Sequence, residues 1–203
     1  MVIWARKLYR IFFGFIFLVV YYFSPYKWIA LIVVGVFLIP LLLLEWARHK
    51  YPGFWPYLMG VTGAKKWYIK VSKRIFKITP GKVMPDTWFL SGIFISIAVF
   101  SKSIAVCVLL FSIFGDAISA IVGTKYGTIK LIGKRSVQGS LAHLAICVLI
   151  GVALITVVEV PFLLILIGAV VATVAEFAPI PVDDNLAVPL ITGIVMELTK
   201  LLI

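Results

Sequence analysis

Charged side chains are scarce in this chain of 203 residues: they make up 13% of it, and only eight of them are acidic. Hydrophobic residues make up 63%, and the mean hydropathy is +1.15. Soluble domains are about 45–50% apolar even when glycine is counted, so a soluble globular fold could not bury this much apolar surface. Intrinsic disorder is excluded as well, because disordered chains have low hydrophobicity. The composition predicts an integral membrane protein, with a single domain over residues 1–203.

Cysteine and histidine are equally scarce, with two of each. Cys107 and Cys147 both fall inside long apolar runs, which predicts small packing residues. No spacing of cysteine and histidine indicates a zinc site. His143 lies near the start of an apolar run, and we interpret it as a packed core histidine rather than a phosphate contact.

Long apolar segments account for most of the chain. A transmembrane helix needs about 20 mostly apolar residues. Seven segments qualify in an all-α reading, although the third is diluted by Ser91, Gly92 and Ser96. The predicted spans are roughly 7–23, 27–46, 86–101, 103–122, 139–158, 160–178 and 186–202.

Basic residues are the abundant charge, with 19 Lys and Arg against eight acids and a net charge of +11. If the N-terminus is cytoplasmic, 16 of the 19 cations fall in inside segments, and only Lys27, Lys102 and Lys200 fall outside. The positive-inside rule therefore predicts a cytoplasmic N-terminus and an outside C-terminus. The cations are expected to face anionic lipid headgroups, and no nucleic-acid partner is expected.

The inside segment between spans two and three, about 47–85, has its own pattern. Its cations recur every three or four residues over 66–77, and Trp67, Val71 and Ile75 recur every four. As a helix, this segment would present one basic and one apolar face and lie in the membrane interface. A solvated basic loop is the alternative.

The acids separate into two groups. Those near the ends of spans are interpreted as interfacial, and they are Glu45, Asp86, Glu159 and Glu197. The others gather at the inside face, and they are Asp116, Glu176, Asp183 and Asp184. Asp116 lies within span four, where a carboxylate costs about 2.5–3.5 kcal/mol. A cation, a metal ion or a water-filled cavity must offset that cost.

Asp183, Asp184 and Asn185 stand in a row before span seven. A helix N-cap would explain one oxygen-bearing side chain there, but not three. Clustered carboxylates suit Mg²⁺, which usually binds one or two carboxylates together with substrate phosphates. We therefore predict Asp116, Glu176, Asp183 and Asp184 as metal ligands.

The loop 123–140 contains four glycines and four cations. Glycines let backbone N–H groups approach phosphate oxygens, and Lys134 and Arg135 could neutralise a polyphosphate. Ser140 begins span five, where a helix N-terminus favours an anion. The spacing is not that of a Walker A loop. An ordinary connecting loop is the alternative, but the nearby acids favour a functional one.

These motifs, in this order, resemble those of the CTP-dependent polyprenol kinase family, which contains dolichol kinases, phytol kinases and CTP-dependent diacylglycerol kinases. The resemblance is strongest over residues 86–200. The matching residues are Gly115-Asp116-Ala117-x-x-Ala120-x-x-Gly123-x-x-x-Gly127, then Lys134-Arg135-Ser136-x-x-Gly139-Ser140, then Glu176, then Asp184-Asn185-x-x-x-Pro189.

The N-terminal part adds two weaker matches. Arg6-Lys7 and Gly14 are similar to the family's Arg-Lys…His…Gly element, although Arg10 stands where the histidine is usual. Glu45 and Arg48 resemble its Glu-x-x-Arg pair near the second span.

The resemblance implies transfer of the γ-phosphoryl group of CTP to the hydroxyl of a membrane lipid alcohol, with a divalent cation, expected to be Mg²⁺. It implies that Asp116, Gly123, Arg6 and Lys7 matter to activity. We assign catalysis to Asp116 and Asp184, whose roles as base and metal ligand could be exchanged. The residues expected to bind the nucleotide are Arg6, Lys7, Gly115, Gly123, Lys125, Gly127, Lys134, Arg135, Ser136, Gly139, Ser140 and Asn185.

Two other functions stay open. A cytidylyltransferase acting on a phospholipid precursor would also use CTP and Mg²⁺, but would release pyrophosphate. A cation-coupled transporter would use Asp116 as an intramembrane ion site. The sequence leaves open which lipid alcohol is the acceptor, whether ATP replaces CTP, and whether the chain forms a homodimer.

Overall fold

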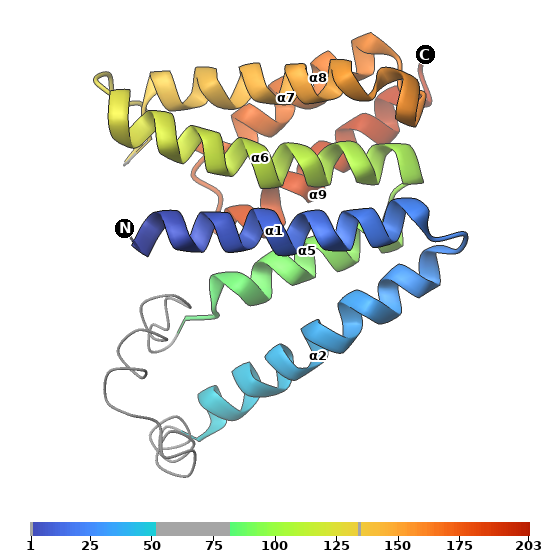
Figure 1. Ribbon diagram of the computed structural model, residues 1–203. Coiled ribbons are helices and arrows are strands. Elements are labelled where there is room, and N and C mark those ends of the chain that lie inside the picture. Colours follow the sequence, from blue (N-terminus) through green and yellow to red (C-terminus); the bar gives the residue numbers. More distant parts are fainter. Residues whose placement is uncertain (1, 52–81, 134) are drawn as a thin grey trace.

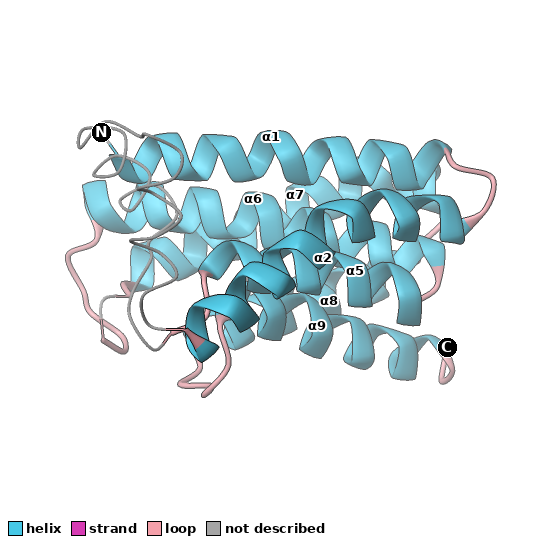
Figure 2. Ribbon diagram, turned by 90° about the horizontal axis from the view of Figure 1, so that it is seen from below, coloured by secondary structure: helices cyan, strands magenta, loops and turns pink. Residues whose placement is uncertain are grey.

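The computed structural model describes residues 2–51, 82–133 and 135–203, with side chains from residue 7 onward. These parts contain seven α-helices (Figure 1), with the bounds α1 Val2–Phe23, α2 Lys27–Lys50, α5 Pro85–Val99, α6 Lys102–Tyr126, α7 Val137–Val158, α8 Phe162–Phe177 and α9 Asp184–Lys200. Within the described ranges no strand occurs (Figure 2), and the β-structure there amounts to one antiparallel bridge between Lys130 and Ser136. The all-α prediction is confirmed for this part of the chain.

Each of the seven predicted apolar segments coincides with one helix. Three of the described helices, α2, α6 and α7, are long and apolar enough to cross a membrane. Helices α5 and α8 are apolar but shorter, with 15 and 16 residues. The predicted basic helix between spans two and three falls almost wholly on 52–81, which lie outside the described residues.

The starts of the later helices follow from local chemistry. Ser136 precedes α7 and accepts a hydrogen bond from the Gly139 N–H at 3.2 Å. Asp183 precedes α9 and accepts from the Asn185 N–H at 3.1 Å. Both are N-caps, which satisfy a backbone donor that has no partner within the helix. Pro85 is the first residue of α5, where its missing N–H costs nothing.

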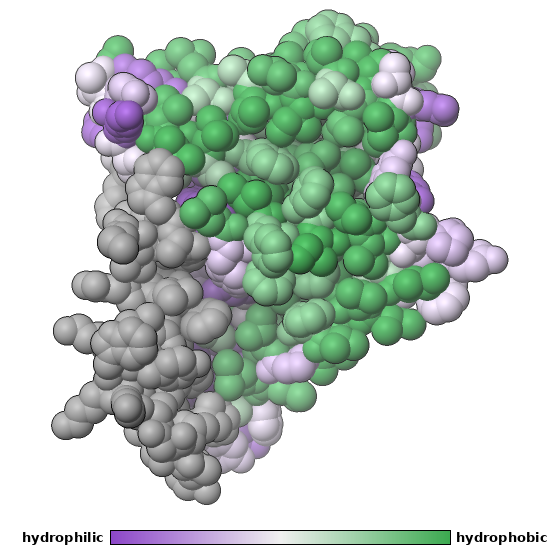
Figure 3. All heavy atoms as spheres, viewed as in Figure 1, coloured by the Kyte–Doolittle hydropathy of each residue, from purple (hydrophilic) through white to green (hydrophobic). Residues whose placement is uncertain are grey.

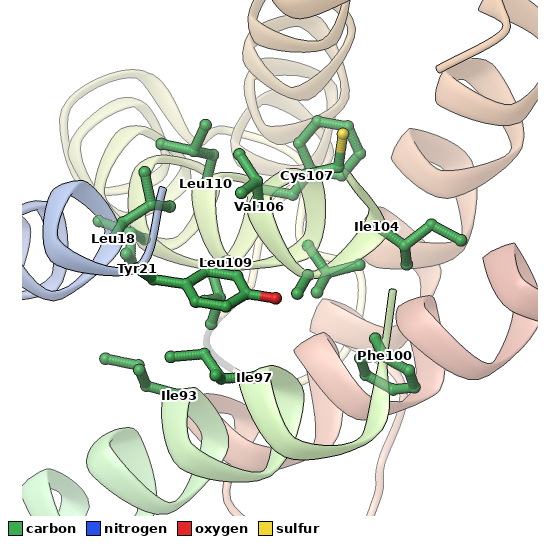
Figure 4. Close-up of a cluster of buried hydrophobic side chains, with 14 of the residues drawn as sticks. Leu18, Tyr21, Ile93, Ile97, Phe100, Ile104, Val106, Cys107, Leu109 and Leu110 are labelled. Atoms are coloured by element: carbon green, nitrogen blue, oxygen red, sulfur yellow. The ribbon is translucent and has the colours of Figure 1, made fainter. Parts of the chain in front are cut away.

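Helix α6 is at the centre of the bundle and packs against α1, α5, α7, α8 and α9. In its most apolar stretch 61% of the residues are buried, against 28% in α2 and 22% in α7. Figure 4 shows the core on one side of α6, where side chains from α1 and α5 meet it. These buried residues are Leu18, Tyr21, Ile93, Ile97, Phe100, Ile104, Val106, Cys107, Leu109 and Leu110. Cys107 and Cys147 are buried free thiols, as predicted.

The helices expose apolar side chains along their middles. Figure 3 shows a broad hydrophobic band on one face, with hydrophilic residues gathered at the two ends of the helices. The start of α1 and the C-terminus lie at opposite ends of the bundle (Figure 1). This distribution of polarity suits association with a membrane.

Candidate active site

A polar cavity of about 140 Å³ lies near the starts of α1, α5 and α9 and the end of α8, beside Ser112 and Asp116 in the second half of α6. All four carboxylates predicted as metal ligands line it, so the structure brings together groups from three helices and a connecting loop. The lining residues are Lys7, Arg10, Pro85, Ser112, Asp116, Glu176, Asp183, Asp184 and Asn185.

Asp116 in α6 is paired with Lys7 in α1. The Lys7 ammonium forms an ion pair with the Asp116 carboxylate, and it also donates to the Asp116 backbone carbonyl at 3.2 Å. The two side chains are 13% and 30% exposed. This ion pair and the cavity offset the cost of placing a carboxylate inside an apolar helix.

Arg135 joins the loop before α7 to the other acidic residues of the cavity. Its guanidinium lies 2.5 Å from Glu176 Oε1 in α8 and donates a hydrogen bond to Asp184 at the start of α9. A planar guanidinium can bind two carboxylates at once, which a lysine ammonium does less well. Arg135 therefore fixes the relative positions of the α8 end and the α9 start.

The Asp183-Asp184-Asn185 row has three different roles. Asp183 caps α9 and also accepts from the Asn185 side-chain amide. Asp184 pairs with Arg135, and the Asn185 amide oxygen accepts from Arg10 Nη1 at 3.0 Å. The N-cap thus explains one residue, as expected, and the other two belong to the walls of the cavity.

Asp184 lies just before the predicted span 186–202. Burial raises its pKa, and so do the negative charges of Asp183 and Asp116, whereas the Arg135 guanidinium opposes the shift. The net direction is upward. A positive charge close to Asp184, such as the Arg135 guanidinium or a bound cation, acts against this rise because it favours the ionised carboxylate.

Mg²⁺ is the ion predicted for this cavity. Among the described residues, no three His, Cys, Asp or Glu side chains converge closely enough to hold a metal ion unaided. Mg²⁺ usually needs only one or two carboxylates, since waters and substrate phosphates complete its coordination. Four carboxylates around one small polar cavity meet that requirement, so the residues fit the ion.

Two glycines of the segment predicted to cradle phosphate, Gly127 and Gly139, lie where the end of α6 meets the start of α7. A Cβ on Gly127, which follows α6, would collide with the side chain of Ser136, the N-cap of α7, and one on Gly139 would lie 2.9 Å from the Ser119 carbonyl. These glycines therefore let the end of α6 pack closely against the start of α7. Ser136 is buried there as the α7 N-cap.

The remaining predicted nucleotide-binding residues lie in different places. Lys125 is exposed, with its ammonium 5.1 Å from the Tyr126 ring centre. Gly115 is buried against His143. The cavity lining does not include Gly115, Gly123, Lys125, Gly127, Arg135, Ser136, Gly139 or Ser140, although Arg135 contacts two of the lining acids. The Arg6 side chain and the whole of Lys134 lie outside the described residues.

Two residues of the cavity region were not predicted to belong there. Asp86, interpreted as interfacial, is only 3% exposed, so neighbouring helices cover it at the start of α5. Arg10 donates to Asp86 Oδ1 from Nε at 3.2 Å and from Nη2 at 3.1 Å, and it also reaches Asn185. The sequence held one signal for this: Arg10 follows Lys7 by three residues, so both lie on one face of the helix. If that face is buried, Arg10 requires an acidic partner.

Glu45, also interpreted as interfacial, is 6% exposed and is buried near the end of α2. Its Oε1 accepts from the Met84 N–H at 2.6 Å, and its Oε2 accepts from Arg48 at 2.6 Å. Arg48 donates in turn to the Lys82 carbonyl. The Glu-x-x-Arg pair therefore joins the end of α2 to the segment entering α5, away from the cavity lining.

Comparison with known proteins gives one partial similarity. Over 108 residues the chain is 28% identical to a protein of Rickettsia prowazekii (strain Madrid E) that bears the name Uncharacterized protein RP860. The similarity covers 51% of this chain and 52% of that protein, so it spans about half the length of this relative. No family model and no solved structure matches the chain.

Proposed function

We propose that this chain is a membrane lipid kinase of the CTP-dependent polyprenol kinase type. It would transfer the γ-phosphoryl group of CTP to the hydroxyl of an isoprenoid alcohol resembling dolichol or polyprenol. The observation that carries the proposal is the cavity in which Asp116, Glu176, Asp183 and Asp184 meet Lys7 at one end of an apolar helix bundle. Charged groups of both signs at the boundary of a membrane suit a reaction between a polyphosphate and a lipid hydroxyl.

The size of the cavity supports phosphoryl transfer rather than enclosure of a whole nucleotide. Its volume of about 140 Å³ would hold roughly four or five water molecules at about 30 Å³ each. Sites that enclose larger ligands have volumes of about 300–1,000 Å³. The cavity would therefore accept the reacting phosphoryl group and a partly hydrated cation, and the nucleoside would lie outside it.

Phosphoryl transfer depends mainly on positioning and charge neutralisation. Asp116 would accept the proton of the lipid hydroxyl, and the alcohol oxygen would form a bond to the γ-phosphorus. The bond between the γ-phosphorus and the β–γ bridging oxygen would break, which releases CDP. Lys7 and Arg135 would neutralise the phosphate oxygens. Asp184 and Glu176, with Asp183 beside them, would hold Mg²⁺, which supplies charge neutralisation on the phosphates when bound.

The membrane arrangement that we propose has seven spans, with the N-terminus in the cytoplasm and the C-terminus outside. The charge count favours this orientation, and it places the cavity at the cytoplasmic end, where CTP is available. The predicted basic segment between spans two and three would lie on the same side of the membrane. A lipid hydroxyl would approach the cavity at headgroup level.

A transfer assay in detergent micelles tests the proposal. The purified chain would receive Mg²⁺ and γ-labelled CTP, then γ-labelled ATP, with a panel of isoprenoid alcohols and diacylglycerol. We expect label in an isoprenoid lipid, with CDP as the co-product and loss of transfer in EDTA. Asp116→Asn should reduce turnover by at least about 100-fold, a typical loss for one acid–base group. Lys130→Ala, which alters an exposed lysine of the loop, is the matched control.

The alternatives predict other outcomes, which α-labelled CTP and reconstituted vesicles would detect. Release of pyrophosphate with α-labelled CTP entering a lipid would replace the kinase by a cytidylyltransferase. Ion-dependent solute flux in vesicles without nucleotide turnover would indicate a transporter. If the folded protein transferred no label to any lipid, the kinase proposal would be contradicted.

A further inference from the structure

His143 lies in α7, and its side chain is completely buried between α6 and α8. Its Nδ1 is 3.0 Å from the Thr173 hydroxyl in α8, and that hydroxyl donates to the Ala169 carbonyl at 2.8 Å. A hydroxyl has only one hydrogen to donate. With the Thr173 hydrogen directed at Ala169, Nδ1 donates to the Thr173 hydroxyl, and Nε2 carries no hydrogen in the neutral ring.

The bare Nε2 points at α6. A Cβ on Gly115 would collide with Nε2 and with the adjacent ring carbons. Nε2 itself is buried and has no hydrogen-bond partner among the described residues. Leaving a buried acceptor without a partner lowers stability, and an apolar side chain would fill the space without that loss. The imidazole thus packs closely against Gly115 and Thr173, but its unpartnered Nε2 lowers the stability of the folded protein.

Both neighbours of His143 are adjacent to carboxylates of the cavity. Gly115 precedes Asp116 in α6. Thr173 precedes Glu176 by three residues in α8, and residues at this spacing share a helix face. A ring wedged between Gly115 and Thr173 controls how closely α6 and α8 approach.

We propose that His143 is a positioning residue: through its contacts with Gly115 and Thr173 it sets the separation between Asp116 and Glu176. This inference rests on the proposed function of the cavity as a cation and phosphate site. His143 does not line the cavity, so it acts through the two helices and not on the substrate itself.

A suppressor experiment tests the steric half of the proposal. Gly115→Ala adds a methyl group where the ring lies, and we expect it to weaken Mn²⁺ binding about tenfold, measured by electron paramagnetic resonance on the folded protein. Adding His143→Ala removes the collision but also the ring that sets the separation, so the double variant should regain part of that affinity and stay weaker than the parent protein. Asp184→Asn shows whether the bound Mn²⁺ occupies the cavity. Gly35→Ala is the matched control, since its new Cβ would lie 3.8 Å from Phe94 in ordinary contact.

Substitutions of Thr173 test whether the hydrogen bond between His143 Nδ1 and the Thr173 hydroxyl contributes to positioning. Thr173→Val removes the acceptor of Nδ1 and should raise the KM for Mg²⁺-bound CTP several-fold with a smaller change in kcat. Thr173→Ser keeps the hydroxyl and should restore the parent KM. If these variants lower the thermal midpoint but leave both KM and Mn²⁺ affinity unchanged, His143 only packs the core and the proposal is overturned.

The two proposals can fail separately. If the parent protein binds Mn²⁺ in an Asp184-dependent manner but transfers no phosphoryl group, the kinase proposal is contradicted, and the Mn²⁺ series still decides the role of His143. If the parent protein binds no Mn²⁺ at the cavity, the positioning role of His143 is overturned as well.

Discussion

At the scale of single residues, each side of the cavity has its own cation. Lys7 pairs with Asp116, while Arg135 contacts both Glu176 and Asp184. Carboxylates that line one small volume repel each other, and without a neighbouring cation some of them would take up protons. A bound divalent cation would also reduce the repulsion among these carboxylates. The effects of Arg135 and Mg²⁺ on the free energy of unfolding should therefore be coupled.

We expect Arg135→Ala to lower the free energy of unfolding in EDTA by roughly 1–2 kcal/mol, less than for a fully buried pair because its side chain is 29% exposed. Mg²⁺ should stabilise this variant more than the parent protein, because the ion would replace the lost positive charge. Thermal unfolding in micelles with EDTA or with Mg²⁺ measures both effects, with Lys130→Ala as the control. An equal Mg²⁺ stabilisation of variant and parent would contradict the coupling.

The pair of Arg10 and Asp86 is more deeply buried, with side chains 8% and 4% exposed. Removing one partner of such a pair usually costs about 3–5 kcal/mol, whereas replacing both by apolar residues can be nearly neutral. We therefore expect Arg10→Met to destabilise the protein strongly, and Arg10→Met with Asp86→Leu to recover most of the loss. Chemical denaturation in micelles measures both. If the double variant were as unstable as the single one, Arg10 would stabilise the fold mainly through Asn185.

At the scale of elements, the close contact of α5 with α9 supports the cavity. A Cβ on Gly92 in α5 would collide with the Asn185 carbonyl, in the first turn of α9. Gly92→Ala should push the two helices apart and cost about 1–3 kcal/mol, as overpacking does. The thermal midpoint measures this loss. Gly35→Ala in α2, whose Cβ would have ordinary contacts, should leave the midpoint unchanged or slightly higher.

The sequence predicted elements better than their contacts. All seven apolar segments proved to be helices, because runs of this length must satisfy their backbone groups internally. The acids of the cavity were found from their rarity within apolar surroundings. Burial of Asp86 and Glu45 was missed, since a position near a helix end does not say whether a neighbouring element covers it. The packing role of Gly127 was missed for a related reason: a glycine that approaches phosphate and one that approaches a helix are alike in sequence.

At the scale of the whole molecule, helix length is at odds with a simple seven-span bundle. Helix α8 has 16 residues, which at 1.5 Å per residue is about 24 Å, whereas the hydrocarbon core is about 30 Å thick. Helices α8 and α9 could therefore cross the membrane with local thinning, or enter and leave on one side. The spanning arrangement places the connection between them at the cytoplasmic surface, whereas the re-entrant arrangement places it within the membrane. This connection carries Asp183, so the position of the cavity depends on the answer.

Cysteine labelling decides the question in a background where Cys107 and Cys147 are replaced by alanine. Single cysteines at the exposed positions Lys130, Glu159, Val182 and Leu202 would be treated with a membrane-impermeant maleimide. We expect Glu159→Cys and Leu202→Cys to react in intact cells, because the proposed topology places them outside. Lys130→Cys and Val182→Cys should react only after permeabilisation, since both would face the cytoplasm. If Val182→Cys reacted under neither condition, α8 and α9 would form a re-entrant pair whose connection lies within the membrane. Reaction of Val182→Cys in intact cells would place Asp183 and Asp184 outside, away from cytosolic CTP, and would contradict the kinase proposal.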